Sequence, residues 1–169
     1  MVARVALLRA VNVGGTGALP MAQLRTLGEA CGFSNVRTYI ASGNLLLESP
    51  LDEAAIKALL EARLLAHAGK PIEVFVRSVD ELEAIIAANP FADAKGSQHM
   101  VFFQEEPTSS DLIDQCRDRQ GERMALGPRE LHVDYGDGIR NSRLKIPGKL
   151  GRTARNINTV RKLALLLRL

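Results

Sequence analysis

The sequence predicts an α+β fold made of duplicated ferredoxin-like βαββαβ units, with helices packed on antiparallel sheets. Three observations predict it. The elements at the start of the chain follow this order, the order begins again from residue 99, and the predicted strands are apolar on both sides. The chain has 169 residues, of which 46% are apolar, so it can bury a substantial core.

The first unit is predicted to span residues 1–77. Its elements are expected to run strand, helix, strand, strand, helix, strand, at residues 2–8, 20–31, 36–40, 45–48, 50–69 and 72–77. The first strand is short and apolar. Pro20 suits the first turn of the following helix, and Gly32 ends it. The turn Ser42-Gly43-Asn44 separates the next two strands, and Asp52 opens a helix with an apolar stripe.

The rest of the chain repeats this order only in part. Residues 78–98 are predicted to be a connecting helix and loop that Asn89-Pro90 closes. Residues 99–169 are predicted to form a second, incomplete ferredoxin-like unit that ends in a basic C-terminal helix. Its strand, helix, strand, strand and helix are expected at residues 99–103, 110–117, 122–126, 131–135 and 157–168.

Strands that are apolar on both sides must be covered on both sides. In the first strand, Val5 and Leu7 point to one side of the sheet and Ala6 and Leu8 to the other. One layer of helices covers only one side, so the second lobe, a partner subunit or both must cover the other. A homo-oligomer is therefore one open alternative. The central strands lack the exposed aromatics of an RNA-recognition motif.

Charge is distributed unevenly along the chain. Of 22 Lys and Arg side chains, nine lie in residues 139–169, which contain none of the 19 Asp and Glu side chains. The preceding residues carry thirteen cations against nineteen anions, although the whole chain has a net charge of +3. Such asymmetry points to an acidic partner, a phosphate-bearing ligand or a nucleic acid. A terminal helix with a solvated basic face explains it equally well.

Polar residues are predicted to converge at one end of the first sheet. The loop after the first strand and the turn after the second strand lie at the same end in a ferredoxin-like unit. Their candidate ligand-binding residues are Arg9, Asn12, Gly14, Gly15, Ser42 and Asn44. Glycines let the main chain approach a ligand, and loop amides beside Arg9 can form an anion nest. Ordinary turn chemistry is the alternative explanation.

A second candidate segment precedes the C-terminal helix. It contributes the candidate ligand-binding residues Arg152, Arg155, Asn156, Asn158 and Thr159. Either Thr153 or Asn156 is predicted to cap the helix. Two arginines at a helix N-terminus are unfavourable by a few tenths of a kcal/mol, up to about 1, unless an anion lies there.

No reaction chemistry is evident in the sequence. His67, His99 and His132 are scattered, no cluster has metal-ligand spacing, and no nucleophile motif is present, so no cofactor and no metal are expected. Cys31 and Cys116 are isolated, which favours a reduced, cytoplasmic location. No segment is long enough to span a membrane.

Four segments resemble one uncharacterised, mostly bacterial family, domain of unknown function 1697. They are residues 7–15 (LLRAVNVGG), 20–24 (PMAQL), 32–44 (GFSNVRTYIASGN) and 155–163 (RNINTVRKL). The resemblance implies a duplicated ferredoxin-like fold and no established activity. The family usually has Gly where this chain has Ala10, and often an aromatic where it has Ile157.

Three functions therefore remain open. The first is a cytoplasmic binding module for a phosphate-bearing ligand, either a nucleotide or a nucleic acid. The second is a structural or oligomerising protein in which the basic tail neutralises acidic surface. The third is a small-molecule enzyme that uses neither a metal nor a covalent nucleophile.

Overall fold

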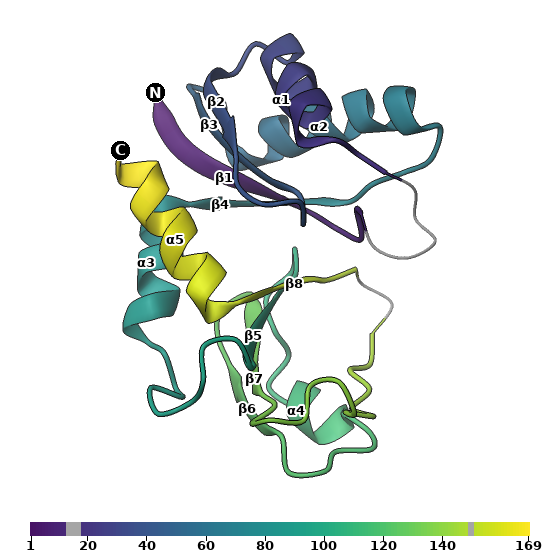
Figure 1. The fold of residues 1–169 in the computed structure, drawn as a ribbon, viewed down its shortest axis with the longest axis vertical. Coiled ribbons are helices and arrows are strands. Elements are labelled where there is room, and N and C mark those ends of the chain that lie inside the picture. The colour runs from purple at the N-terminus through teal and green to yellow at the C-terminus, as the bar shows by residue number, and fades with distance from the viewer. Residues whose placement is uncertain (13–17, 149–150) are drawn as a thin grey trace. The chain divides into compact units, whose positions relative to one another are not determined.

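The structure, a computed structural model, describes residues 1–12, 18–148 and 151–169 (Figure 1). The chain divides into two compact units. The first unit comprises Met1–Glu83 and Leu163–Leu169, and the second unit comprises Ala84–Lys162. The boundaries predicted from the sequence at residues 77 and 98 stay a prediction.

The first unit has the predicted βαββαβ order. Its elements are β1 (Val2–Leu8), α1 (Met21–Ala30), β2 (Ser34–Thr38), β3 (Asn44–Ser49), α2 (Glu53–Ala68) and β4 (Val74–Ser78), followed by the start of α3 (Val79–Ala87). The sheet order is β2-β3-β1-β4 and every neighbouring pair is antiparallel. This is the strand order of a ferredoxin-like unit and confirms the predicted fold class.

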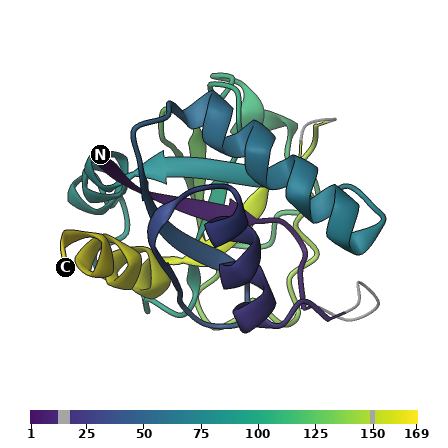
Figure 2. The same cartoon turned by 90° about the horizontal axis from the view of Figure 1, so that it is seen from above.

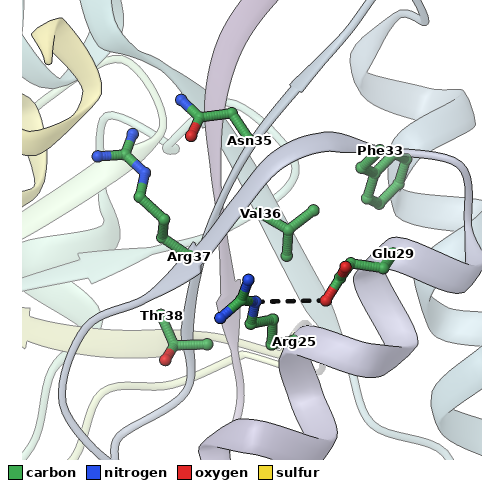
Figure 3. A pocket seen from close by; sticks show the side chains of 7 residues that line it. All are labelled: Arg25, Glu29, Phe33, Asn35, Val36, Arg37 and Thr38. Atoms are coloured by element: carbon green, nitrogen blue, oxygen red, sulfur yellow. Dashed lines mark ion pairs between the residues drawn. The ribbon is translucent and has the colours of Figure 1, made fainter.

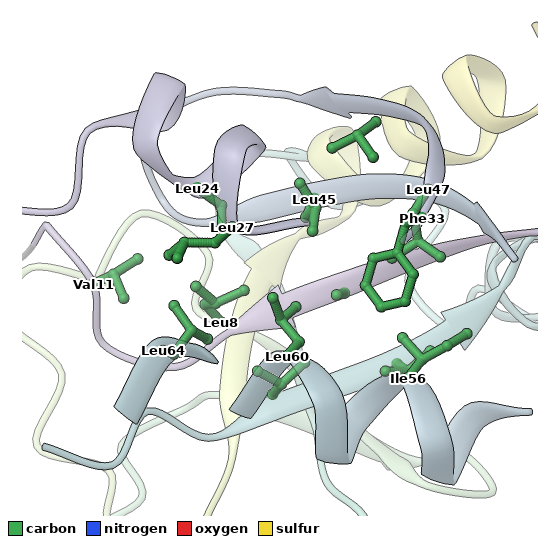
Figure 4. Close-up of a cluster of buried hydrophobic side chains, with 14 of the residues drawn as sticks. Leu8, Val11, Leu24, Leu27, Phe33, Leu45, Leu47, Ile56, Leu60 and Leu64 are labelled. Carbon is green, nitrogen blue, oxygen red and sulfur yellow. The ribbon is translucent and has the colours of Figure 1, made fainter. Parts of the chain in front are cut away.

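Helices α1 and α2 cover one face of this sheet (Figure 2). Their apolar stripes meet alternate residues of β1, β3 and β4, as the period-two alternation of strands requires. The labelled residues of this core are Leu8, Val11, Leu24, Leu27, Phe33, Leu45, Leu47, Ile56, Leu60 and Leu64 (Figure 4). The helices thus bury one of the two apolar faces anticipated from the sequence.

Local signals set the ends of both helices. Pro20 lies at the N-cap of α1, and Gly32 follows its end with a φ of +87°. The Asp52 side chain accepts a hydrogen bond of 2.8 Å from the Ala55 N–H and caps α2. The sequence predicts both helices closely because these end signals are strong and local.

The opposite face of the first sheet is also buried. Its fully buried side chains are Val5, Leu7, Leu46, Phe75 and Arg77. Both faces of these strands are therefore buried, as their apolar residues predicted. Arg77 is an arginine with no exposed surface, and its Nη1 donates to the carbonyl of Val76 at 3.0 Å.

The second unit repeats the sheet order of the first. Its elements are β5 (His99–Phe103), α4 (Leu112–Gln115), β6 (Arg123–Leu126), β7 (Glu130–Asp134), β8 (Thr153–Asn156) and α5 (Ile157–Arg168), whose last turns belong to the first unit. The order β6-β7-β5-β8 matches β2-β3-β1-β4 position by position, again with antiparallel pairing. The duplication therefore extends to all four strands.

Strand β8 is the main difference from the sequence-based expectation. The sequence predicts no fourth strand here and places Thr153 in a loop, whereas Thr153 pairs with Phe103 in the sheet. Four residues, only one of them β-branched, give too little signal for a strand. Between β7 and β8 the described residues form turns and one bridge, Arg117–Lys145, where the first unit has α2.

None of the helices in the described part of the chain combines the length and apolar character needed to cross a membrane.

Replacing Gly43 with Ala is expected to destabilise the first unit by about 2–5 kcal/mol. Gly43 has a φ of +89°, which strains an L side chain by about 1–2 kcal/mol. Its added Cβ would also lie 2.5 Å from Cγ2 of Val11, which adds about 1–3 kcal/mol of overpacking. Urea denaturation measures the change.

Gly32→Ala is the matched control for Gly43→Ala. Gly32 has nearly the same φ, +87°, but a Cβ added there would meet nothing within 4 Å. Gly32→Ala should therefore lower the unfolding free energy only by the backbone strain of about 1–2 kcal/mol. Equal losses in the two variants would contradict the close approach of Gly43 to Val11.

Candidate functional site

The loop after β1 and the turn between β2 and β3 meet at one end of the first sheet. The Leu8 N–H donates to the carbonyl of Gly43 at 2.9 Å. Asn12 Nδ2 donates to the carbonyl of Ala41 at 2.8 Å, so the two segments are joined beyond the strands as well. The structure therefore brings Asn12 to the turn that contains Ser42 and Asn44, as the predicted strand directions require.

The Asn12 side chain closes the base of the glycine-rich loop. Its Oδ1 accepts from the Leu19 N–H at 2.5 Å, and its Nδ2 donates to the Leu19 carbonyl at 2.8 Å. One amide group thus pairs with both main-chain groups of Leu19 and, through Ala41, with the neighbouring turn. Gly14 and Gly15, the other candidates in this loop, lie outside the described residues.

Asn44 and Ser42 organise the turn itself. Asn44 is fully buried, and its Nδ2 donates to the carbonyl of Tyr39 at 2.9 Å and to Oγ of Ser42 at 3.1 Å. Both residues therefore hold the turn in shape next to Asn12. The ordinary turn chemistry that the sequence left open accounts for these contacts.

Arg9 lies at the edge of this region and lines a cavity. Its Nη1 forms an ion pair of 3.2 Å with Oε1 of Glu73, and about half of the Arg9 side chain is exposed. The cavity has a volume of about 360 Å³ and is also lined by Ala10, Lys70, Ile72 and Glu73. Cationic side chains from the end of β1 and from the α2–β4 connection therefore share one recess.

A second cavity adjoins the first. It has a volume of about 380 Å³ and shares Ala10, Lys70 and Ile72 with the cavity at Arg9. Its further lining includes His67 and the buried side chains of Val11 and Leu19. The two recesses together form what we call the loop groove. It has a cationic rim and an apolar wall.

The main chain beside the loop groove is strained. Ala10 and Asn12 have φ values of +55° and +56°, in the left-handed region that non-glycine residues avoid. Asn tolerates this conformation better than Ala does. Strained backbone of this kind is concentrated at binding sites, where the surrounding contacts enforce it.

The second candidate segment holds the second sheet together. Arg155 lies in β8 with 5% of its surface exposed, and burial lowers its pKa to about 10. Its Nη1 donates to Oγ1 of Thr153 and to the carbonyl of Ala154. Arg152 donates to Oε1 of Gln104 at 2.9 Å and to the carbonyl of Pro147 at 2.8 Å.

The end of this segment caps α5, as predicted. Oδ1 of Asn156 accepts from the Thr159 N–H at 2.9 Å, so Asn156 is the capping residue of the two considered. Asn158 lies against Gly96, where an added Cβ would approach its Oδ1 to 2.1 Å. Both asparagines therefore have structural roles next to β8.

Several cations of the basic tail pair with acidic residues of the same chain. Arg168 forms ion pairs with Asp80 and Glu83, and Lys145 pairs with Asp118 at 3.6 Å. Arg155 is buried. Part of the charge excess in residues 139–169 thus serves the fold.

Sequence reasoning missed a buried histidine pair. Nε2 of His99 and Nδ1 of His132 lie 2.8 Å apart, between β5 and β7. Burial lowers the pKa of His132 to about 4, and the neighbouring His99 contributes to this shift. His99 and His132 lie on the same sheet face as Val101. The sequence alone does not reveal this, because it depends on which residues of β5 and β7 lie opposite each other.

The surroundings of His99 combine aromatic and charged groups. The ring of Phe91 packs edge-on at a centroid distance of 5.4 Å, and Arg123 lies over that ring. Burial lowers the pKa of His99, Asp134 opposes this shift, and Arg161 and Arg123 reinforce it. Nδ1 of His99 is buried and has no hydrogen-bond partner among the described residues.

Among the described residues, no group of three His, Cys, Asp or Glu side chains could hold a metal ion. Cys31 and Cys116 are both free, and burial raises the pKa of each thiol. The strongest chemical feature of the first unit is therefore the loop groove.

The family with the description "Protein of unknown function (DUF1697)" matches residues 1–132, more than three quarters of the chain. The chain belongs to this family. A solved structure, conserved bacterial protein SP0830 from Streptococcus pneumoniae, superposes with a TM-score of 0.80 at 21% identity, and the match covers 98% of each chain. That likeness shows that the two proteins share a fold. No curated protein matches the chain.

The structure shows the surroundings of the two positions at which this chain departs from the usual DUF1697 pattern. The glycine usual in this family falls at Ala10, whose positive φ is the conformation that glycine adopts without strain. The aromatic often present in the family falls at Ile157, which is only 1% exposed and is the first residue of α5. In this chain the Ile157 side chain therefore packs in the protein interior.

Replacing Asn12 with Asp should destabilise the chain by about 1–2 kcal/mol, because Asn12 is exposed and its two lost hydrogen bonds are only partly shielded from water. The substitution keeps the shape but turns Nδ2 into an oxygen, which then faces the carbonyls of Leu19 and Ala41 without a hydrogen to donate. Asn35→Asp is the control, because Asn35 is exposed and has a positive φ, as Asn12 does, but has no side-chain hydrogen bond among the described residues. Urea unfolding should show little change in stability for that control. Similar losses of stability in both variants would argue that the Asn12 hydrogen bonds do not stabilise the chain.

The stability of the chain should fall as the pH drops from about 6.5 towards 4. In the unfolded chain His132 takes up a proton near its ordinary pKa of 6.5, whereas in the folded chain its pKa is about 4. The unfolded state therefore binds more protons in this window, at a cost of up to about 3 kcal/mol. His132→Gln should flatten this part of the pH profile of the unfolding free energy. An unchanged slope in His132→Gln would rule out this origin.

Proposed function

We propose that the chain is a binding module for a small phosphate-bearing ligand, of the nucleotide class, which binds in the loop groove. The observation that carries this proposal is the pair of adjoining cavities lined by Arg9, His67 and Lys70. Each cavity has a volume in the range of small-ligand sites.

The charge of the loop groove favours an anion. Arg9 and Lys70 are exposed cations, and Glu73 is the one carboxylate in the described lining. Nη1 of Arg9 already pairs with Oε1 of Glu73 at 3.2 Å. A phosphate group can pair with the same guanidinium through two of its oxygens, whereas Glu73 accepts from a single nitrogen.

The apolar wall favours a ligand that is larger than a free phosphate. Val11, Leu19 and Ile72 line the recess next to the cationic rim. A nucleotide can place its phosphates at Arg9 and Lys70 and its base against this wall. The described residues of the wall include no aromatic side chain, so the base would pack against aliphatic side chains and would not stack on a ring.

The remaining predicted site residues of the first unit act in this proposal through the shape of the site. Asn12, Ser42 and Asn44 hold the two segments at the end of the sheet. The residues Arg152, Arg155, Asn156, Asn158 and Thr159 hold β8 and the start of α5.

A structural role for the basic tail is the second candidate function. The ion pairs of Arg168 and Lys145 with acidic residues favour it, because a tail that is neutralised within the chain has less charge for a polyanion. This role and ligand binding in the loop groove are compatible, and it makes a nucleic acid the less favoured ligand.

The proposal predicts that ATP binds more tightly than adenosine and that Arg9→Gln weakens ATP binding about ten-fold. The loss of one charge-assisted hydrogen bond is worth about 1.5–3 kcal/mol, and about 1.4 kcal/mol is a factor of ten. Glu73→Gln should strengthen ATP binding about two- to five-fold, because Arg9 then has no carboxylate partner to give up. Isothermal titration calorimetry of the full chain measures all three.

Arg25→Gln is the matched control for these titrations. Arg25 is exposed and pairs with Glu29 at 3.3 Å, much as Arg9 pairs with Glu73, but it does not line the loop groove. It should leave ATP binding unchanged. Equal binding of ATP and adenosine, or equal losses in Arg9→Gln and Arg25→Gln, would refute the phosphate site.

A further inference from the structure

The outer edge of β2 carries a separate cavity. Strand β2 lies at one end of the sheet order and pairs only with β3. A recess of about 500 Å³ runs along this edge, lined by Arg25, Glu29, Phe33, Asn35, Val36, Arg37 and Thr38 (Figure 3). None of these residues lines the loop groove, so the two sites are distinct.

The main chain of this edge can pair with another strand. The Tyr39 N–H donates to the carbonyl of Asn44 at 3.1 Å, and Thr38 and Arg37 lie opposite Leu45 and Leu46. Because main-chain groups alternate in direction along an antiparallel strand, the N–H and C=O of Thr38 point away from β3. An edge of this kind is a template for an added strand.

The preceding residues limit how much of the edge is available. The register shifts between Ser34 and Arg37, and Asn35 has a φ of +48°. Such a bulge bends the strand and interrupts regular pairing. A partner can therefore pair over only a short stretch centred on Thr38, so side-chain contacts must supply much of its affinity.

Arg37 supplies an unsatisfied donor at this edge. Its Nε is buried, and it forms no hydrogen bond with any described residue. The guanidinium also makes no ion pair within the described part of the chain, in contrast to Arg25, which pairs with Glu29. A buried N–H without an acceptor is unfavourable, and a carboxylate is its strongest complement.

The charged side chains flank the edge on both faces of the sheet. Arg25 and Glu29 project from α1 on the helix-covered side, whereas Arg37 and Asn35 point away from α1 (Figure 3). Successive side chains of an added strand would point alternately to these two sides. Two arginines against one glutamate make the recess complementary to acidic residues.

We propose that the outer edge of β2 binds a short, extended, acidic segment of a partner protein by strand addition. The partner's main chain pairs with Thr38, and its carboxylates reach Arg37 on one face and Arg25 on the other. A second copy of this chain fits less well, because pairing two β2 edges would bring like-charged Arg37 side chains together across the new ladder.

A palindromic peptide tests this proposal in either strand direction. Fluorescein-labelled, end-capped Thr-Val-Glu-Glu-Val-Thr places one glutamate on each face, and Thr-Val-Gln-Gln-Val-Thr is its uncharged counterpart. Fluorescence anisotropy with the full chain should show at least about ten-fold tighter binding of the acidic peptide. Arg37→Gln should remove most of this difference, and N-methylation of both glutamates should weaken binding at least about three-fold by blocking strand pairing.

Arg9→Gln is the control and should leave peptide binding unchanged, because Arg9 lines only the loop groove. The peptide result is thus independent of the ATP titrations. Equal binding of the two peptides, or a preference that survives in Arg37→Gln, would overturn the acidic site. Binding that is insensitive to N-methylation would overturn strand addition. Dimerisation of the chain through β2 in sedimentation experiments would show that a second copy, and not a partner protein, binds this edge.

Discussion

The Asn12 side chain holds together the end of the first sheet on which the proposed ligand site depends. One amide pairs with both main-chain groups of Leu19 and with the carbonyl of Ala41. It therefore fixes where the glycine-rich loop leaves and rejoins the body of the unit. Ala10, two residues earlier, has a positive φ and lines both recesses of the loop groove. A strained backbone persists only where neighbouring contacts compensate for it. The hydrogen bonds of Asn12 fix the chain soon after this residue.

The two units show that the same sheet can be completed in two ways. Both have one strand order, but the first unit joins its third and fourth strands through the sixteen residues of α2, and the second uses a segment of turns. In the second unit Leu144 and Ile146, from this segment, pack on the small core around Leu131 and Val133. Irregular chain thus covers a sheet face that a helix covers in the first unit. A core that needs only a few apolar side chains does not require a helix to supply them.

Elements with strong local signals were predictable from the sequence. The capped helix after Asp52, the strands at residues 2–8 and 99–103, and the meeting of Asn12 with the turn at Ser42 follow from caps, apolar runs and strand direction. Strand β8 and the pairing of His99 with His132 did not follow, because both depend on which strands become neighbours. The positive φ of Asn35, which ends regular pairing of β2, likewise has no clear sequence signal. The site residues chosen from the sequence stay a prediction, and most of those that the structure describes bond to the chain itself.

The arginines of this chain show why net charge along the sequence is a weak guide to function. The cations of the basic tail stand out in the sequence, yet Arg155 is buried and Arg168 pairs with Asp80 and Glu83. Arg9 and Arg37 lie instead in the acidic first part of the chain, where their charge is outnumbered in the sequence. What distinguishes these two is their setting: Arg9 shares a recess with Lys70, and Arg37 has a buried Nε with no acceptor in the described chain. An anion responds mainly to cations within about 10 Å, because screening at physiological ionic strength weakens the effect of more distant exposed charges. The local surroundings of Arg9 and Arg37, rather than the excess of charge in the tail, therefore carry the electrostatic argument for binding.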